Sequence, residues 1–166
     1  MATPLTKALQ QSNVDWVNSQ PYRFNVAICL HLPDTYRSAQ NGWSDSALRT
    51  KLRRFFNRLD SKVLKAAHRH GKKRVPRFIV LEKGAAVGWH AHALLSSETS
   101  KMSTEQLCMA VKLLWHEELG NPGTNGFHAR LAWAKPAGDR YARYMTKSLY
   151  GPNATGIFDD MNTAFN

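Results

Sequence analysis

The chain has 166 residues, enough for one domain with a substantial core and too few for two. Hydrophobic residues make up 43% of it, which excludes a disordered composition. It carries 23 Lys and Arg against 12 Asp and Glu, a formal net charge of +11. Such a surplus favours contact with polyanions, foremost nucleic acid, although an acidic membrane surface or a merely solubilising charge would also account for it.

The cysteines and the N-terminus exclude several classes of protein. Cys29 and Cys108 each lie in an apolar segment, which indicates two buried thiols in a reducing compartment rather than a disulfide framework or a cysteine zinc site. The first residues lack a basic region followed by an apolar run, so they do not form a secretory signal. No stretch approaches the roughly 18 apolar residues of a membrane span. We expect a soluble, intracellular protein.

The first half of the chain predicts a helix, a strand and a long helix. Residues 4–18 favour a short helix. Residues 23–32 alternate cleanly and predict a strand with one fully apolar face and a second face that carries Cys29. Residues 33–43 contain loop-forming types. A helix capped by residue 44 or 45 should then run to about residue 70, where a glycine follows.

The second half adds three strands and two helices. Strands over 77–82 and 89–95, joined by a Gly- and Ala-rich loop, should form an antiparallel hairpin. An amphipathic helix is expected over 103–119, a fourth strand over 127–133 and a last helix over 139–150. The polar tail that follows shows no period.

This order of elements predicts the fold class. Strand, helix, strand, strand, helix, strand, helix is typical of an α+β protein with a ferredoxin-like or RRM-like antiparallel sheet. Two helices should cover one face, which leaves the other for a site near the last helix. We expect one domain over 1–166, with residues 1–20 as a helical extension and 152–166 as a tail of unassigned role.

Basic side chains dominate the long helix and the segment after it. Beyond its cap, Asp60 is the only acid of this helix. Most charge runs of this kind are solvated faces, and a DNA-facing surface is the alternative. The candidate DNA-binding residues are Arg49, Arg53, Arg54, Arg58, Lys72, Lys73 and Arg74.

A pair of histidines on the second hairpin strand suggests a metal site. Residues two apart on a strand point the same way, so His90 and His92 should project side by side. Glu82 ends the partner strand on a face that is otherwise apolar. Two imidazoles and a carboxylate can hold one divalent ion and leave positions open. A chance pair is the alternative, and His68 with His70 illustrates it: on a helix, two residues apart means about 200° around the axis.

The last helix carries a tyrosine beside a lysine. Tyr144 and Lys147 are three apart and therefore neighbours on a helix, with Tyr141 one step earlier. A free phenol, with a pKa near ~10, is a weak nucleophile, but an adjacent ammonium and a metal-polarised phosphate would make its attack feasible. A packed tyrosine and a solvated lysine is the alternative. The apolar side that would anchor this helix consists of Ala142, Met145 and Leu149.

Together these motifs resemble those of the HUH endonucleases, and within them the rolling-circle replication initiators with a single catalytic tyrosine. Residues 89–94 (WHAHAL) match the family's histidine–hydrophobic–histidine motif, and residues 144–147 (YMTK) match its tyrosine–x–x–lysine motif. Residues 82–84 (EKG) stand where parvovirus-like initiators carry a metal-binding glutamate. The histidines precede the tyrosine, as in initiators and unlike relaxases. The resemblance spans about residues 22–150.

The resemblance implies a mechanism. Glu82, His90 and His92 would hold Mg²⁺ or Mn²⁺, and Tyr144 would attack the scissile phosphate of single-stranded DNA, leaving a 5′-phosphotyrosine and a free 3′-hydroxyl. Lys147 would offset the developing charge. The substrate would be a replication origin with a stem-loop, in a plasmid, phage or virus. A separate helicase and a host polymerase would be partners, because the chain has no phosphate-loop motif.

Several alternatives stay open. Tyr141 is a second candidate for the nucleophile. An RRM-like module could bind single-stranded nucleic acid without cutting it, a metal hydrolase could use the same ligands with an activated water, and a related transposase would share the bond-making chemistry. The cell compartment would be the cytoplasm of a bacterial or archaeal host, or the nucleus for a viral element.

Overall fold

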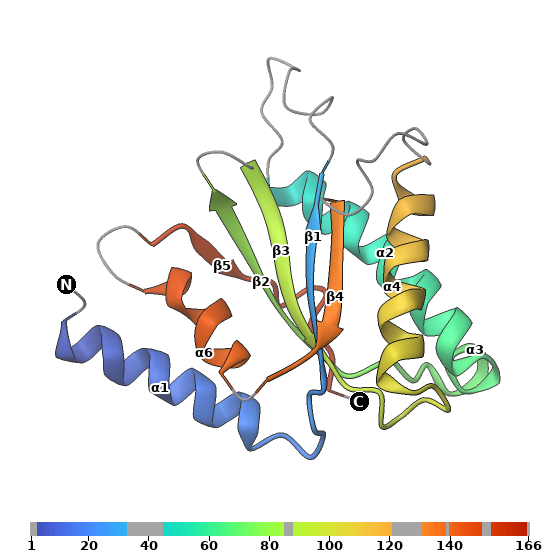
Figure 1. Cartoon of the computed structure of the whole chain (residues 1–166), viewed down its shortest axis with the longest axis horizontal. Helices are drawn as coiled ribbons and strands as arrows, with labels where there is room; N and C mark the ends of the chain where they lie inside the picture. The colour runs from blue at the N-terminus through green and yellow to red at the C-terminus, as the bar shows by residue number, and fades with distance from the viewer. Residues whose placement is uncertain are drawn as a thin grey trace.

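The computed structural model describes residues 3–32, 45–84, 88–120, 131–138, 140–150 and 154–165. Its elements in chain order (Figure 1) are α1 (Pro4–Asn18), β1 (Val26–His31), α2 (Asp45–Leu64), α3 (Ala66–Gly71), β2 (Arg77–Gly84), β3 (Gly88–Leu95), α4 (Thr104–Glu118), β4 (Ala132–Pro136), α6 (Tyr141–Thr146), the 3₁₀ turn η2 (Lys147–Leu149) and β5 (Gly156–Phe158). Within these ranges no helix is both long and apolar enough to cross a membrane.

The strands form one sheet in the order β4-β1-β3-β2-β5. Every neighbouring pair is antiparallel. The connection β1–α2–β2–β3–α4–β4 follows the βαββαβ order of ferredoxin-like folds, and β5 adds a short strand at the β2 edge. The predicted α+β class with an antiparallel sheet is confirmed.

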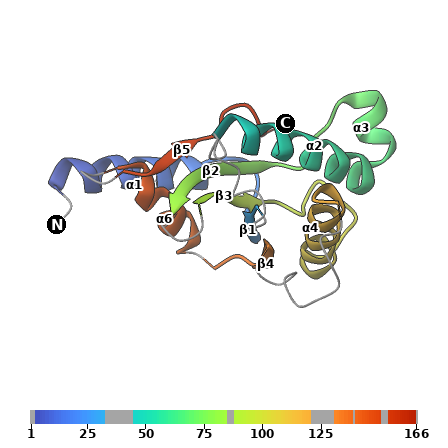
Figure 2. The same ribbon diagram turned by 90° about the horizontal axis from the view of Figure 1, so that it is seen from above.

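Each face of the sheet is covered by its own helices (Figures 1 and 2), α2, α3 and α4 on one side and α1 and α6 on the other. The larger core lies under α2 and α4 and takes alternate strand residues such as Ile28 and Ile79. The smaller core lies under α1 and α6 and takes the intervening residues, including Val80 and Leu94, with Met145 of α6. The alternation of each strand therefore decides which side chains face the tyrosine helix.

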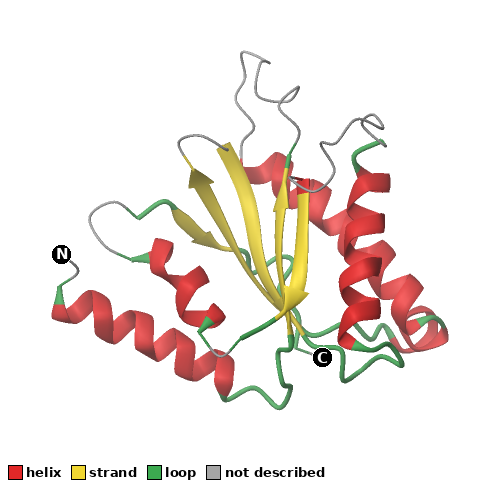
Figure 3. Ribbon diagram, in the orientation of Figure 1, coloured by secondary structure: helices red, strands yellow, loops and turns green. Residues whose placement is uncertain are grey.

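Local signals explain where several elements begin. Ser103 caps α4, since its side chain accepts from the backbone N–H of Gln106 while the Gln106 side chain accepts from the Ser103 N–H. Thr3 caps α1 in the same position before a proline. The helix expected to run to residue 70 is interrupted, because Lys65 adopts a positive φ of 49° and breaks the helical hydrogen-bond ladder. Secondary structure coloured on the ribbon (Figure 3) makes the separate α3 visible.

The C-terminal third departs most from the sequence expectation. The fourth strand was expected over 127–133 but covers Ala132–Pro136, where it pairs with β1; residues 127–130 lie outside the described ranges. The last helix is shorter than expected and tightens into η2 at Lys147. The tail, for which no element was expected, supplies β5, which pairs with Val80–Glu82. A three-residue edge strand is too short to produce a recognisable alternation.

A buried ion pair ties the tail to α2. Asp60 and Arg77 are 0% and 2% exposed, and the guanidinium donates to the carboxylate at 2.7 Å. The same guanidinium donates to the Asn162 carbonyl at 2.7 Å and lies 4.5 Å from the centroid of the Phe56 ring. Burial lowers the pKa of Arg77, an effect that Asp60 opposes. The acid in the body of the basic helix, Asp60, is thus the partner of a buried cation.

A glycine marks the close approach of β5 to the turn after the tyrosine helix. A Cβ on Gly156 would lie 2.5 Å from Ser148 Oγ and 2.9 Å from the Ser148 backbone carbon. We expect Gly156→Ala to destabilise the fold by about 1–3 kcal/mol, measured by urea denaturation, because the backbone must move to relieve the overlap. Gly138→Ala is the matched control, since no described atom lies within 4 Å of its Cβ position. Equal midpoints for the two variants would refute this packing.

Candidate functional site

The site face of the sheet is built from β1, β3 and β2. His90 and His92 of β3 both point to this face, because they are two residues apart on the strand. The register places Cys29 opposite His92 on one side and Glu82 opposite His90 on the other. His31 of β1 lies opposite His90, and the two rings stack with centroids 5.0 Å apart. Three adjacent strands therefore bring their titratable side chains to one place.

The structure brings together the three predicted metal ligands. Glu82 Oε2 lies 3.3 Å from His92 Nε2 and 4.0 Å from His90 Nε2. The two imidazole rings are 4.9 Å apart between centroids, and both histidines are buried. Glu82 remains partly exposed, at 19% of its side chain, so the cluster opens to solvent on its β2 side.

The hydrogen bonds of the two histidines indicate which ring nitrogen of each carries the proton. His90 Nδ1 lies 3.1 Å from the Gly88 carbonyl, which can only accept, so we assign the proton to Nδ1. The Tyr141 hydroxyl donates to the Ile28 carbonyl at 3.0 Å and therefore accepts from His92 Nδ1 at 3.3 Å. In the neutral tautomers that these contacts favour, the lone pairs of both Nε2 atoms face the Glu82 carboxylate. Lone pairs that converge on one carboxylate without a proton between them suit a cation.

Electrostatics agrees with a neutral imidazole at His92. Burial, and after it the neighbouring His90, His31 and Lys147, lowers the pKa of His92 to about 3. His92 is therefore uncharged near neutral pH, the form in which imidazole binds metals. The donor set and its protonation fit a divalent ion.

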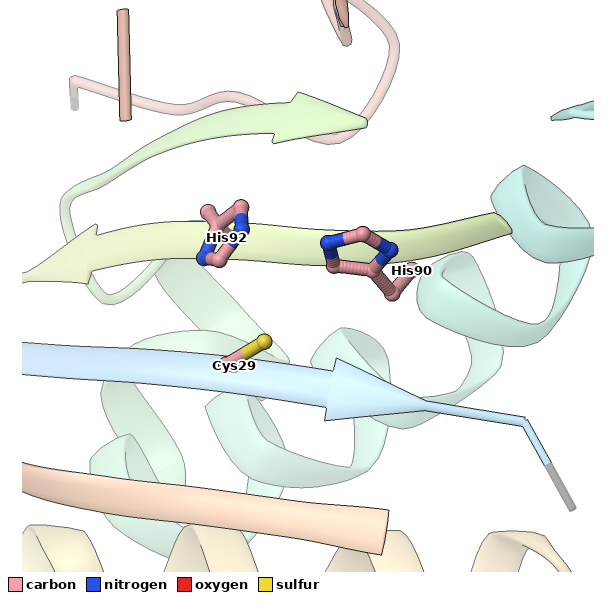
Figure 4. Close-up of side chains that lie close together, drawn as sticks. All are labelled: Cys29, His90 and His92. Atoms are coloured by element: carbon pink, nitrogen blue, oxygen red, sulfur yellow. The ribbon is translucent and has the colours of Figure 1, made fainter. Parts of the chain in front are cut away.

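Cys29 is a further member of this cluster. Ligand atoms of Cys29, His90 and His92 all lie within 4.8 Å of one another, and Figure 4 shows the three side chains side by side on β1 and β3. Cys29 was not among the metal ligands expected from the sequence, whereas the structure contains a buried Cys-His-His group that could hold a metal ion. The thiol also lies 3.1 Å from His31 Nε2. The sequence does place Cys29 on the more polar face of its strand. It does not show that this strand pairs with β3, which carries the histidines.

The tyrosine helix covers this cluster. The Tyr144 ring lies edge-on to His92, with centroids 5.5 Å apart, and 46% of Tyr144 is exposed. Lys147 Nζ lies 4.0 Å from the centroid of the Tyr144 ring, as the three-residue spacing predicts. Tyr141 stacks on Tyr144 at 5.7 Å. Burial, with smaller contributions from Cys29 and Tyr144, raises the pKa of Tyr141 well above its usual value.

The N-terminal helix holds the tyrosine helix against the sheet. Gln10 Nε2 donates to the Arg143 carbonyl at 2.8 Å, and the Arg143 guanidinium donates to the Gln11 side chain. Farther along α1, the Asn13 side chain bonds the Tyr150 hydroxyl. The expected N-terminal extension is thus part of the layer that carries Tyr144.

The predicted DNA-binding residues lie apart from this cluster, on or after α2, which packs on the opposite face of the sheet. Arg49 bonds the buried Asp159 at 2.7 Å and connects α2 to the tail. Arg58 pairs with Glu117 of α4. All members of the set except Arg49 are exposed, including Arg58.

Comparisons with known proteins give little. No protein-family model matches the chain, and no curated protein matches it. Among solved structures, the N-terminal nuclease domain of non-structural protein 1 of minute virus of mice is similar at a TM-score of 0.34 and 12% identity, over 93% of this chain and 73% of that one. That domain coordinates Zn²⁺ in its active-site pocket and recognises DNA at the origin of replication.

Proposed function

We propose that this chain is a metal-dependent endonuclease that nicks and rejoins single-stranded DNA through a covalent tyrosine intermediate, in the manner of HUH replication initiators. One observation carries the proposal. A half-exposed phenol, Tyr144, stands between an ammonium at 4.0 Å from its ring and the buried imidazole of His92, whose neighbours could hold a cation. A nucleophile, a positive charge and a group of potential metal ligands that contact one another are sufficient for phosphodiester chemistry.

Glu82, His90 and His92 are the residues that would hold the ion, for which we propose Mg²⁺ or Mn²⁺. When bound there, the cation would polarise a phosphate oxygen and neutralise its charge. Neighbouring residues orient these ligands for binding an ion. Gly88 and Tyr141 orient the two imidazoles so that their bare nitrogens face the carboxylate.

Tyr144 supplies the nucleophile. Its oxygen forms a bond to the phosphorus of the scissile phosphate, and the bond from that phosphorus to the 3′-oxygen breaks. The phenol proton of Tyr144 passes to solvent and the 3′-oxygen takes a proton from solvent, so the products are a 5′-phosphotyrosine and a 3′-hydroxyl. Lys147 offsets the negative charge that develops during the attack. Because one phosphodiester is exchanged for another, the strand can be resealed without ATP, and the 3′-hydroxyl can prime rolling-circle synthesis.

Tyr144 suits this role better than Tyr141 for a geometric reason. The Tyr141 hydroxyl donates to the Ile28 carbonyl and accepts from His92, so it is fully occupied in positioning the imidazole. Its raised pKa also disfavours the phenolate. We assign Tyr141 as a positioning residue.

The test is a covalent-adduct assay. The protein is incubated with labelled single-stranded oligonucleotides, including origin-like stem-loops, with Mn²⁺ and with chelator, and resolved on denaturing gels. We expect an adduct with Mn²⁺ and none with chelator. His90→Ala should form at least about a hundredfold less adduct at limiting metal, since loss of even a supporting group of a metal ligand costs up to that factor in affinity. His70→Ala, exposed on α3, is the matched control and should behave as wild type.

Two outcomes would contradict the proposal. Retained DNA binding with no adduct under any metal would leave a binding module. Cleavage without an adduct, dependent on the same histidines, would indicate hydrolysis by an activated water.

A further inference from the structure

We infer that Cys29 is a direct ligand of the metal centre, and that the centre selects a thiophilic cation of the Zn²⁺ class over Mg²⁺. The inference rests on the metal site of the proposed function but not on its reaction. It differs from the expectation of Mg²⁺ or Mn²⁺ because it adds a sulfur donor to the ligands Glu82, His90 and His92.

The first support is position. Cys29 lies directly across from His92 in the β1–β3 register, and its sulfur lies within 4.8 Å of a nitrogen of each histidine. Glu82 approaches the same imidazoles from β2, with its oxygen 3.3 Å from His92 Nε2. One sulfur and two nitrogens thus lie within 4.8 Å of one another on two adjacent strands, and the Glu82 carboxylate lies beside the imidazoles on a third. Zn²⁺ takes four donors, and in sites that act on a substrate three of them come from the protein.

The second support is the chemistry of the donors. Mg²⁺ prefers octahedral oxygen coordination and retains several waters, whereas thiolate and imidazole select Zn²⁺ and similar ions. Here one carboxylate is the single oxygen donor among the four side chains, and both histidines and Cys29 are less than 9% exposed. A thiol releases its proton when its sulfur binds a cation.

The second cysteine provides the comparison. Cys108 is also buried, but it lies on α4 in the larger core, on the opposite face of the sheet. Among the described residues it belongs to no group of potential ligands. Packing alone therefore accounts for Cys108, whereas the sulfur of Cys29 faces two imidazoles.

The test uses Co²⁺ as an optical probe for Zn²⁺, with no DNA present. We expect a sulfur-to-cobalt charge-transfer band that Zn²⁺ abolishes by displacement. Cys29→Ser should lose the band, and its Zn²⁺ affinity, measured by competition with a chromophoric chelator, should fall by about a hundredfold or more. Cys108→Ser should keep both. Mn²⁺ affinity, measured by electron paramagnetic resonance, should stay within about threefold in Cys29→Ser, because Glu82, His90 and His92 remain.

Cys29→Ala, checked by circular dichroism, separates loss of the ligand from loss of the fold: a folded variant without the band supports the inference. Wild-type protein that binds Co²⁺ without the charge-transfer band, or Cys29→Ser with undiminished Zn²⁺ affinity, would overturn it. The outcomes are independent of catalysis. A band without a DNA adduct would retain the sulfur ligand and reject the nuclease, and an adduct without a band would do the reverse.

Discussion

Tyr144→Phe should abolish covalent attachment to DNA and slow strand cleavage by about 10⁴-fold or more, the scale of losing a nucleophile. The variant removes one oxygen and keeps the ring that contacts His92 and Lys147. DNA affinity and stability should therefore stay close to wild type. The measurement is the fraction of oligonucleotide in a covalent adduct over time, together with a filter-binding affinity.

Two other tyrosines serve as controls for that result. Tyr150→Phe should still form the adduct, because its hydroxyl bonds Asn13 of α1 and its loss removes one of the several contacts between α1 and the layer that carries Tyr144. Tyr141→Phe should slow the reaction by about ten- to a hundredfold, through loss of the hydrogen bond that orients His92, yet still form the adduct. An adduct that persists in Tyr144→Phe and disappears in Tyr141→Phe would move the nucleophile by one helical turn.

Asp60→Ala should destabilise the protein by about 3–5 kcal/mol, because it leaves the Arg77 guanidinium buried without its carboxylate. The free energy of unfolding from urea titration measures it, and the loss should appear as a lower midpoint at an unchanged slope. The pair lies beneath α2, away from the tyrosine, so the folded fraction should retain its metal affinity.

The partner substitution makes the test specific. Asp60→Leu combined with Arg77→Met should recover most of the lost stability, because a buried pair replaced by apolar side chains leaves no stranded charge. Asp15→Ala, on the exposed side of α1, should change stability by less than about 0.5 kcal/mol. A single Asp60→Ala variant as stable as Asp15→Ala would contradict the account of this pair.

The strand pattern could be predicted from the sequence because burial follows alternation. Ile28 enters the larger core while Cys29 turns to the other face, as the period of two requires. The break in the long helix at Lys65 could not be predicted, since Lys has no preference for a positive φ and the surrounding residues keep a helical period. Nor could β5, whose three residues gain order from pairing with β2 rather than from their own composition.

Part of the candidate site could be predicted from the sequence. Spacing alone places His90 beside His92, and the hairpin connection places Glu82 opposite His90, because both relations are local. Cys29 is some sixty residues away from these histidines along the chain, and only the pairing of β1 with β3 brings it to them. The proximity of Cys29 to the histidines depends on the order and register of the strands, and no short segment of sequence predicts these.

The layer over the site joins α1 with α6, so it combines the two ends of the chain around strands made in between. A ribosome emits the histidine hairpin long before Tyr144, and β5, which packs on the turn after Tyr144, later still. During synthesis the imidazoles therefore exist without a phenol to act beside them. The imidazoles, Tyr144 and the turn that follows it reach their final arrangement only after β5 has been made and pairs with β2.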